Sequence, residues 1–186
     1  MRIVGGQFKG RTIAAPKGPG TRPTSDKARE SLFNIIDHAD WVPPLEGARV
    51  MDIYAGSGAL GLEAISRGAS FCLFVETSSA ARGAIRDNAE LFQLFGNTRI
   101  HRRDATFLGT KPAGVGPPFD FAFMDPPYGY DLGPKTLRTL KEGGWLKPEA
   151  LVILEVGSDE DPDTAGWTIL DERKWGKAKV FFLKAE

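Results

Sequence analysis

Hydrophobic and polar positions change their spacing in a regular way from about residue 48 onward. Runs rich in β-branched and aromatic residues predict five strands, at residues 48–55, 71–76, 97–104, 119–125 and 149–157. Apolar residues at helical spacing predict helices between them, at 60–68, 78–95 and 132–144. Strands that alternate with helices of this length form a parallel sheet covered on both faces. We therefore expect an α/β fold with a mostly parallel sheet.

The two ends of the chain follow a different pattern. Residues 167–175 and 178–186 predict a closing antiparallel hairpin that turns at Gly176. Residues 2–14 predict a small N-terminal hairpin around a glycine-rich centre, and a helix capped by Thr24, Ser25 or Asp26 follows it. Two prolines end this unit, so we divide the chain into an extension, 1–44, and a main domain, 45–186.

The amino-acid composition is that of an ordinary globular protein. The chain has 186 residues, of which 41% are hydrophobic and 26% charged, as in ordinary globular proteins. It has no apolar run of membrane-spanning length and no signal-peptide core, so we expect a cytoplasmic protein. The single cysteine, Cys72, excludes an internal disulfide and lies in an apolar run typical of a buried thiol. We expect no metal site and a monomer.

Charge is balanced overall but unevenly distributed. The chain has 24 basic and 24 acidic residues, yet residues 1–35 carry seven Lys or Arg and two acids. A basic segment on a neutral protein is typical of one surface that faces a polyanion, and a solvated arm is an equal alternative. The polyanion hypothesis makes Arg22, Lys27 and Arg29 candidate residues for contacts to a nucleic acid.

The loop after the first predicted strand has the pattern of a nucleotide pocket. Gly56, Gly58 and Gly61 form a G-x-G-x-x-G that follows a strand and opens a helix. Such glycines permit a tight turn and a close approach of the backbone to a ligand at a helix N-terminus. A plain strand-to-helix turn is the alternative.

Three acids at strand ends add to this pocket, and Asp52 among them favours S-adenosylmethionine over NAD as its ligand. Asp52, four residues before Gly56, can receive an ammonium group and would be unfavourable beside a pyrophosphate. Glu76 ends the second strand, where a carboxylate can accept both ribose hydroxyls of either cofactor type. Asp104 ends the third strand and can accept from an adenine amino group, although a turn cap explains it nearly as well.

The tetrad Asp125-Pro126-Pro127-Tyr128 is the most informative motif. It follows the fourth strand, so we expect it in the same crevice. An exocyclic amine of a nucleobase is a poor nucleophile, because its lone pair is delocalised into the ring. The Asp125 carboxylate and the rigidly held Pro126 carbonyl can accept its two N–H groups and draw it toward tetrahedral geometry. Tyr128 offers a ring on which a flipped base can stack. Adenine, cytosine and guanine could all be activated in this way.

These motifs together resemble class I methyltransferases. More narrowly, RIVGGQFKGRTI, RPTSDKARESLFNII and AGSGALGLEAISRGA are similar to segments of the bacterial 16S ribosomal RNA guanine-N2 methyltransferase family. The resemblance implies a Rossmann-like, seven-stranded sheet whose last two strands form a hairpin. It implies methyl transfer from S-adenosylmethionine to a guanine of 16S ribosomal RNA in an assembled or assembling small ribosomal subunit.

The resemblance also implies roles for individual residues. It makes residues 45–186 the methyltransferase domain, places Arg22 to Thr24 near the cofactor and RNA entrance, and makes Asp125 to Tyr128 the amine-activating tetrad. The cofactor-binding residues it implies are Asp52, Tyr54, Gly56, Gly58, Glu76, Asp104 and Ala105. The chain departs from the family where a Tyr-Gly-Asp-Thr type of turn is expected, since it reads Trp175-Gly176-Lys177-Ala178.

Three alternatives stay open on the sequence. The same chemistry could act on adenine N6 in DNA or another RNA, although the chain has no room for a separate DNA-reading domain. A dinucleotide-dependent oxidoreductase would explain the glycine loop and Glu76 but neither Asp52 nor the tetrad. A non-enzymatic assembly factor would not explain an intact tetrad.

Overall fold

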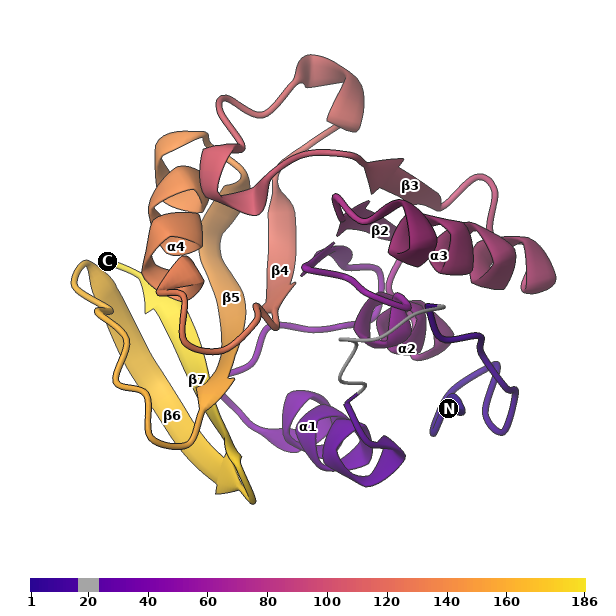
Figure 1. Cartoon of the computed structure of the whole chain (residues 1–186), viewed down its shortest axis with the longest axis horizontal. Helices are drawn as coiled ribbons and strands as arrows, with labels where there is room; N and C mark the ends of the chain where they lie inside the picture. Colours follow the sequence, from indigo (N-terminus) through magenta and orange to yellow (C-terminus); the bar gives the residue numbers. More distant parts are fainter. Residues whose placement is uncertain (17–23) are drawn as a thin grey trace.

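The computed structural model describes residues 1–16 and 24–186 and contains one seven-stranded sheet in the order β3-β2-β1-β4-β5-β7-β6. The strands are β1 (Arg49–Ile53), β2 (Phe71–Val75), β3 (Thr98–His101), β4 (Phe119–Met124), β5 (Leu146–Gly157), β6 (Trp167–Trp175) and β7 (Ala178–Ala185). The first five run parallel, and β7 pairs antiparallel with β5 and β6. The predicted fold class, including the closing hairpin, is confirmed (Figure 1).

Within the described residues, four helices and two short 3-10 turns accompany the sheet. The helices are α1 (Asp26–His38), α2 (Ala59–Ser66), α3 (Ser79–Leu91) and α4 (Leu132–Glu142), and the turns are η1 (Ala105–Phe107) and η2 (Ala113–Val115). Ser25 is the residue that caps α1, because its side chain accepts from the Ala28 backbone N–H. The helices lie where the hydrophobic spacing predicts them, whereas η1 and η2 are too short to give a periodic signal.

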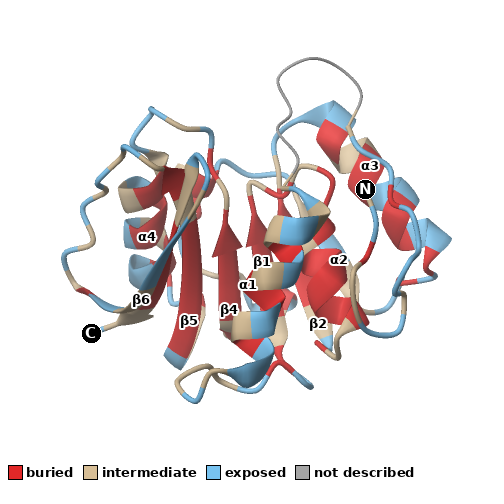
Figure 2. Ribbon diagram, turned by 90° about the horizontal axis from the view of Figure 1, so that it is seen from below, coloured by how far each residue is buried: buried red, intermediate tan, exposed pale blue. Residues whose placement is uncertain are grey.

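Alternate residues of the strands face two separate hydrophobic layers. Phe123 and Ile153 pack in the layer covered by α1, α2 and α3, whereas Met124 and Leu154 pack in the layer covered by α4 and η1. The central strands are buried on both sides, which accounts for their continuous apolar sequences (Figure 2). Cys72 is fully buried in the first layer, and burial raises its pKa well above the usual value.

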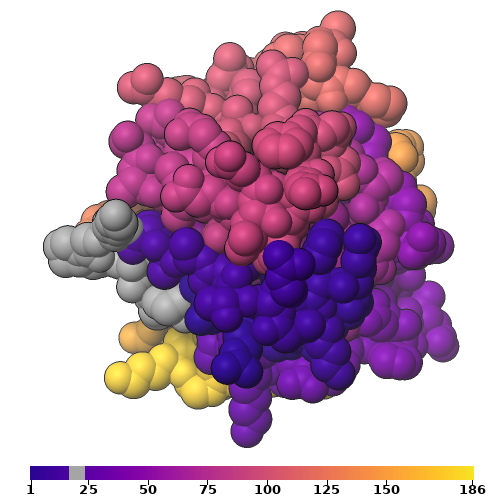
Figure 3. Space-filling model, turned by 90° about the vertical axis from the view of Figure 1, so that its right-hand side faces the viewer, coloured from indigo at the N-terminus to yellow at the C-terminus, as the bar shows by residue number. Residues whose placement is uncertain are grey.

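The N-terminal segment differs from the predicted hairpin. It contains one antiparallel bridge, Arg2 to Thr12, and no extended strands. Some hairpin pairing is present, since Ile3 N donates to Arg11 O and Ile13 N donates to Met1 O. Other backbone donors bind the main domain: Val4 N and Gly5 N donate to the Glu63 carboxylate, and Phe8 N donates to Ser66 Oγ. The segment is therefore a strap packed against α2 and α3 (Figure 3). It shares the first hydrophobic layer with the main domain, so the proposed boundary at residue 44 does not divide two cores.

None of the helices in the described ranges is long and apolar enough to cross a membrane.

Candidate active site

A cavity of about 680 Å³ opens at the carboxyl ends of the parallel strands. This volume lies within the range of small-molecule sites. Its wall contains six of the seven predicted cofactor residues, Asp52, Tyr54, Gly56, Glu76, Asp104 and Ala105. All four residues of the Asp125–Tyr128 tetrad line it as well. Motifs that are up to 76 residues apart in the chain (Asp52 to Tyr128) thus meet in one cavity, because parallel strands all end at this edge of the sheet.

The glycine loop forms one wall of the cavity. Gly56 has φ +58° and a Cβ added there would meet nothing within 4 Å. Gly58 does not line the cavity; it is the N-cap of α2, with φ +81°. At Gly61 a Cβ would come 2.5 Å from Cys72 Sγ, so this glycine permits close packing of α2 on β2. The three glycines therefore serve three different purposes.

Asp52 connects this loop to the sheet. Its side chain is almost fully buried, and Gly61 N donates to its Oδ2 at 2.9 Å. Burial raises the pKa of the Asp52 carboxyl to about 8; the hydrogen bond from Gly61 opposes this rise, and the nearby Glu76 charge adds to it. Asp52 is therefore an acid poised to ionise when a cation enters the cavity.

The other two strand-end acids face the cavity differently. Glu76 accepts from Gly56 N at 2.8 Å through one oxygen and from Ser78 N at 2.9 Å through the other, so it links the second strand to the glycine loop. Asp104 caps η1 by accepting from the Thr106 backbone and hydroxyl, and these bonds lower its pKa. Asp104 is thus the turn cap that the sequence offered as one alternative. It also lines the cavity, as a residue that accepts from an adenine amino group would have to.

The tetrad is held from two sides. Tyr128 Oη donates to Glu155 Oε2 at 2.8 Å, and Gly129 N donates to Glu160 Oε1 at 2.7 Å. Thr24 Oγ1 donates to Asp125 Oδ2 at 3.4 Å, which places the start of α1 beside the tetrad. The sequence arguments missed both acids: Glu155 lies near the end of β5, where it reads as one polar residue in an apolar strand, and Glu160 lies in the acidic stretch that follows β5 and has the pattern of a solvated loop.

The four candidate RNA-binding residues are not equivalent. Lys27 is exposed, and Thr24 lines the cavity. Arg22 lies outside the described residues. Arg29 is wrong as an RNA-facing residue: its exposure is 0%, and its guanidinium binds Glu63, Asp26 and the Thr24 carbonyl. The buried face of α1, which includes Leu32, Phe33 and Ile36, begins at Arg29, so helical spacing was the signal for its burial.

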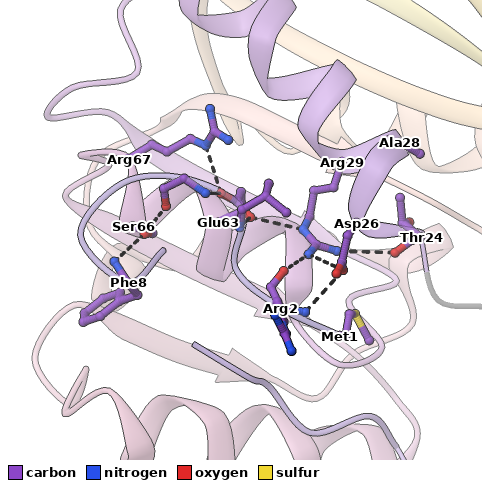
Figure 4. A network of polar contacts seen from close by, with 12 residues as sticks. Met1, Arg2, Phe8, Thr24, Asp26, Ala28, Arg29, Glu63, Ser66 and Arg67 are labelled. Carbon is purple, nitrogen blue, oxygen red and sulfur yellow. Dashed lines mark hydrogen bonds and ion pairs between the residues drawn. The ribbon is translucent and has the colours of Figure 1, made fainter. Parts of the chain in front are cut away.

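Arg29 belongs to a network that fixes the N-terminal strap. The Glu63 carboxylate receives Arg29 Nε at 3.2 Å and Arg67 Nε at 2.9 Å in addition to the two backbone N–H groups of the strap. Figure 4 shows these partners converging on Glu63. Farther along the strap, Asn88 exchanges two hydrogen bonds with the Ala14 backbone and donates to Ser57 O. The network explains how Met1, Ala15 and Pro16 come to line the cavity.

No cluster of three or more His, Cys, Asp or Glu suited to a metal ion occurs within 1–16 and 24–186.

Comparison with known proteins agrees with this geometry. The family model described as "Conserved hypothetical protein 95" matches residues 1–184. The "Ribosomal RNA small subunit methyltransferase D" of Escherichia coli (strain K12) is 37% identical over 189 residues, which cover 100% of this chain and 90% of that protein. The protein of the same name from Haemophilus influenzae is 33% identical and covers 95% of this chain and 89% of that protein.

A solved structure shows the same architecture. The Escherichia coli protein yhhF superposes with a TM-score of 0.82 at 34% identity, covering 100% of this chain and 98% of that chain. The chain therefore belongs to the family described as Conserved hypothetical protein 95, alongside the ribosomal RNA small subunit methyltransferases D, which confirms the rRNA methyltransferase family expected from its motifs.

Proposed function

We propose that this protein transfers a methyl group from S-adenosylmethionine to the exocyclic N2 of a guanine in 16S ribosomal RNA, within an assembling small ribosomal subunit in the cytoplasm. One observation carries the proposal: six of the seven predicted cofactor residues and all four residues of the tetrad line one cavity. The identity to the methyltransferases D supports the ribosomal substrate.

The cavity fits S-adenosylmethionine by the chemistry of its donors and acceptors. Asp52 would hold the ammonium group, Glu76 the ribose hydroxyls and Asp104 the adenine amine, while Gly56 leaves open space beside the backbone. When bound, S-adenosylmethionine supplies an electrophilic methyl group. Tyr54, whose hydroxyl pairs with Thr136 Oγ1 at 2.6 Å, and Ala105 complete the pocket wall.

The tetrad would prepare the amine for attack. The Asp125 carboxylate and the Pro126 carbonyl accept the two N–H groups, so the nitrogen lone pair turns away from the ring. Asp125 is also placed to receive the proton that the amine loses. The Tyr128 ring would stack on the flipped base, worth about 1–3 kcal/mol. Thr24, which lines the cavity, and the exposed Lys27 remain our candidates for contacts to RNA, and Arg22 remains a candidate from the sequence.

The proposal predicts a clear order among substrates. Purified protein with labelled S-adenosylmethionine should methylate small-subunit particles, or 16S ribosomal RNA, and leave duplex DNA unmodified. Digestion of the product should give N2-methylguanosine. Label in duplex DNA alone, or N6-methyladenine as the product, would instead support the adenine alternative.

The raised pKa of Asp52 predicts proton release on cofactor binding. At pH 7 a carboxyl with a pKa of about 8 is mostly protonated, and a bound ammonium would favour its ionised form. Calorimetry with S-adenosylhomocysteine in buffers of different ionisation enthalpy should show about one proton released per ligand bound. Asp52→Asn should bind more weakly and release none.

Stability gives a second test of Asp52. Its folded-state pKa of about 8 is above the ordinary pKa of 3.8 for an aspartate, so the folded state loses stability as pH rises between these two values. Asp52→Asn, which keeps an acceptor for Gly61 N, should therefore raise the melting temperature of the ligand-free protein at pH 8.5 but not at pH 4. Equal proton release by both proteins, or no stabilisation at pH 8.5, would contradict the role of Asp52.

A further inference from the structure

Two carboxylates lie on the same side of neighbouring strands at the edge of the sheet that carries the cavity. Phe123 pairs with Ile153 and Met124 with Leu154, so one further step in this register sets Asp125 beside Glu155. Phe123 and Ile153 face the α1 side of the sheet, and side chains two residues later face the same side. Adjacent strands lie about 4.8 Å apart, which brings the two carboxylates within reach of one small group.

Both carboxylates border the space next to the tetrad. Asp125 and Glu155 line one recess, together with Thr24, Leu60 and Trp175. The recess adjoins the large cavity, because Thr24, Leu60 and Asp125 line both. Glu155 also lines a cavity of about 220 Å³ on the other side of the Pro127–Tyr128 wall. Glu155 is therefore beside any base that stacks on Tyr128.

The hydrogen bond between Tyr128 and Glu155 orients this carboxylate. Tyr128 Oη donates to Glu155 Oε2 at 2.8 Å, so the acid is tied to the ring on which the base would stack. A carboxylate offers about four acceptor positions, so Glu155 can accept from Tyr128 and from a second donor at the same time. Ionised Glu155 can only accept hydrogen bonds, so a donor on the base is the group that it would recognise.

We propose that Glu155 reads the Watson–Crick edge of the target base by accepting N1–H of guanine, while Asp125 accepts from N2. This rests on the proposed function. Guanine presents N1–H next to its exocyclic amine, whereas adenine N1 and cytosine N3 present a lone pair next to theirs. Flipped bases are commonly read through this edge. Paired carboxylates therefore favour guanine, which supplies the base selectivity that the tetrad alone lacks.

The test compares two bases that carry the same reacting amine. Once the target nucleotide is mapped, small-subunit RNA is prepared with guanine or with 2,6-diaminopurine at that position; diaminopurine keeps the N2 amine but has a lone pair at N1. The wild-type protein should prefer guanine in kcat/KM. Glu155→Gln, whose amide can accept from N1–H or donate to N1, should lower this preference by about ten- to a hundredfold.

Controls separate reading of the base from support of Tyr128. A role limited to holding Tyr128 would lower transfer to both bases equally, so an unchanged ratio in Glu155→Gln overturns the proposal. Glu172→Gln removes a negative charge from β6 on the α4 side of the sheet, where Glu172 pairs with Phe181, and should leave the ratio unchanged. Glu155→Asp keeps the charge on a shorter side chain and should lose guanine transfer without gaining diaminopurine transfer.

The proposed function can fail separately. If the wild-type protein makes no N2-methylguanosine in the guanine RNA, the proposed function is wrong. If the wild-type protein makes that product, but its guanine-to-diaminopurine ratio of kcat/KM equals that of Glu155→Gln, only the assignment of Glu155 is wrong. Melting curves of each variant check that the compared proteins are folded.

Discussion

Asp125→Ala should lower methyl transfer by at least about 10³-fold while leaving cofactor affinity within about threefold of the wild-type value. Removal of one preorganised group that stabilises a transition state typically costs about 10²–10³ in kcat, and Asp125 is proposed to take up the proton as well. Cofactor affinity should persist because the proposed cofactor contacts come from other residues that line the cavity. Single-turnover rates and calorimetry with S-adenosylhomocysteine measure the two quantities separately.

Two further variants define what Asp125 contributes. Asp125→Asn keeps an acceptor oxygen but lacks the charge, so its rate should lie between those of the wild type and Asp125→Ala. Asp120→Asn is the matched control: Asp120 lies near the start of β4, the strand that leads to Asp125, and its carboxylate pairs with Lys147 and accepts from Arg49 N. Undiminished turnover in Asp125→Ala would exclude the amine-activating role of Asp125, even though the fold and the position of the tetrad would be unchanged.

The parts of the site that were predictable are those fixed by local sequence. Gly56 is in a loop that joins a strand to a helix. Such a loop lies at the carboxyl edge of a parallel sheet, whichever position its strand has in the sheet. The same holds for Asp125, because a motif that directly follows a parallel strand must lie at the carboxyl edge. Neither prediction needs to know which strands are neighbours, and both residues line the cavity.

Contacts between distant segments were not predictable in this way. Arg29 was interpreted from its charge, but Glu63, which lies 34 residues later, neutralises it in the interior. Glu63 is the one charged residue of α2, whose other residues are apolar apart from Ser66, and such a pattern is unusual enough to indicate a buried partner. Likewise, the N-terminal hairpin was predicted from its β-prone residues. The segment keeps one antiparallel bridge, but part of its backbone donors bind Glu63 and Ser66 on α2, contacts that its own sequence does not indicate.

The buried ion pair between Arg29 and Glu63 links the N-terminal strap to the active site. Arg29 Nη1 donates to the Thr24 carbonyl at 3.3 Å, and Thr24 Oγ1 donates to Asp125. Glu63 therefore positions the start of α1, and through it one wall of the cavity, without touching the cavity itself. A change at Glu63 should affect both the stability of the fold and the arrangement around Asp125.

Glu63→Ala should lower the free energy of unfolding by about 3–5 kcal/mol. The substitution removes a counter-ion of the buried Arg29 guanidinium, and it also removes the acceptor of two backbone N–H groups of the strap. Urea unfolding followed by circular dichroism measures the loss. Asp37→Ala removes the more exposed acid that pairs with Arg67 in the same network and should cost less than about 1 kcal/mol.

The comparison between these two variants also tests the connection to the active site. At a temperature where both are folded, Glu63→Ala should bind S-adenosylhomocysteine more weakly than Asp37→Ala, because the strap carries Met1, Ala15 and Pro16 into the cavity wall. Equal stability of the two variants would mean that the strap is held by its apolar contacts, such as the stacking of Phe8 on Phe92 at 4.7 Å, rather than by the charge network.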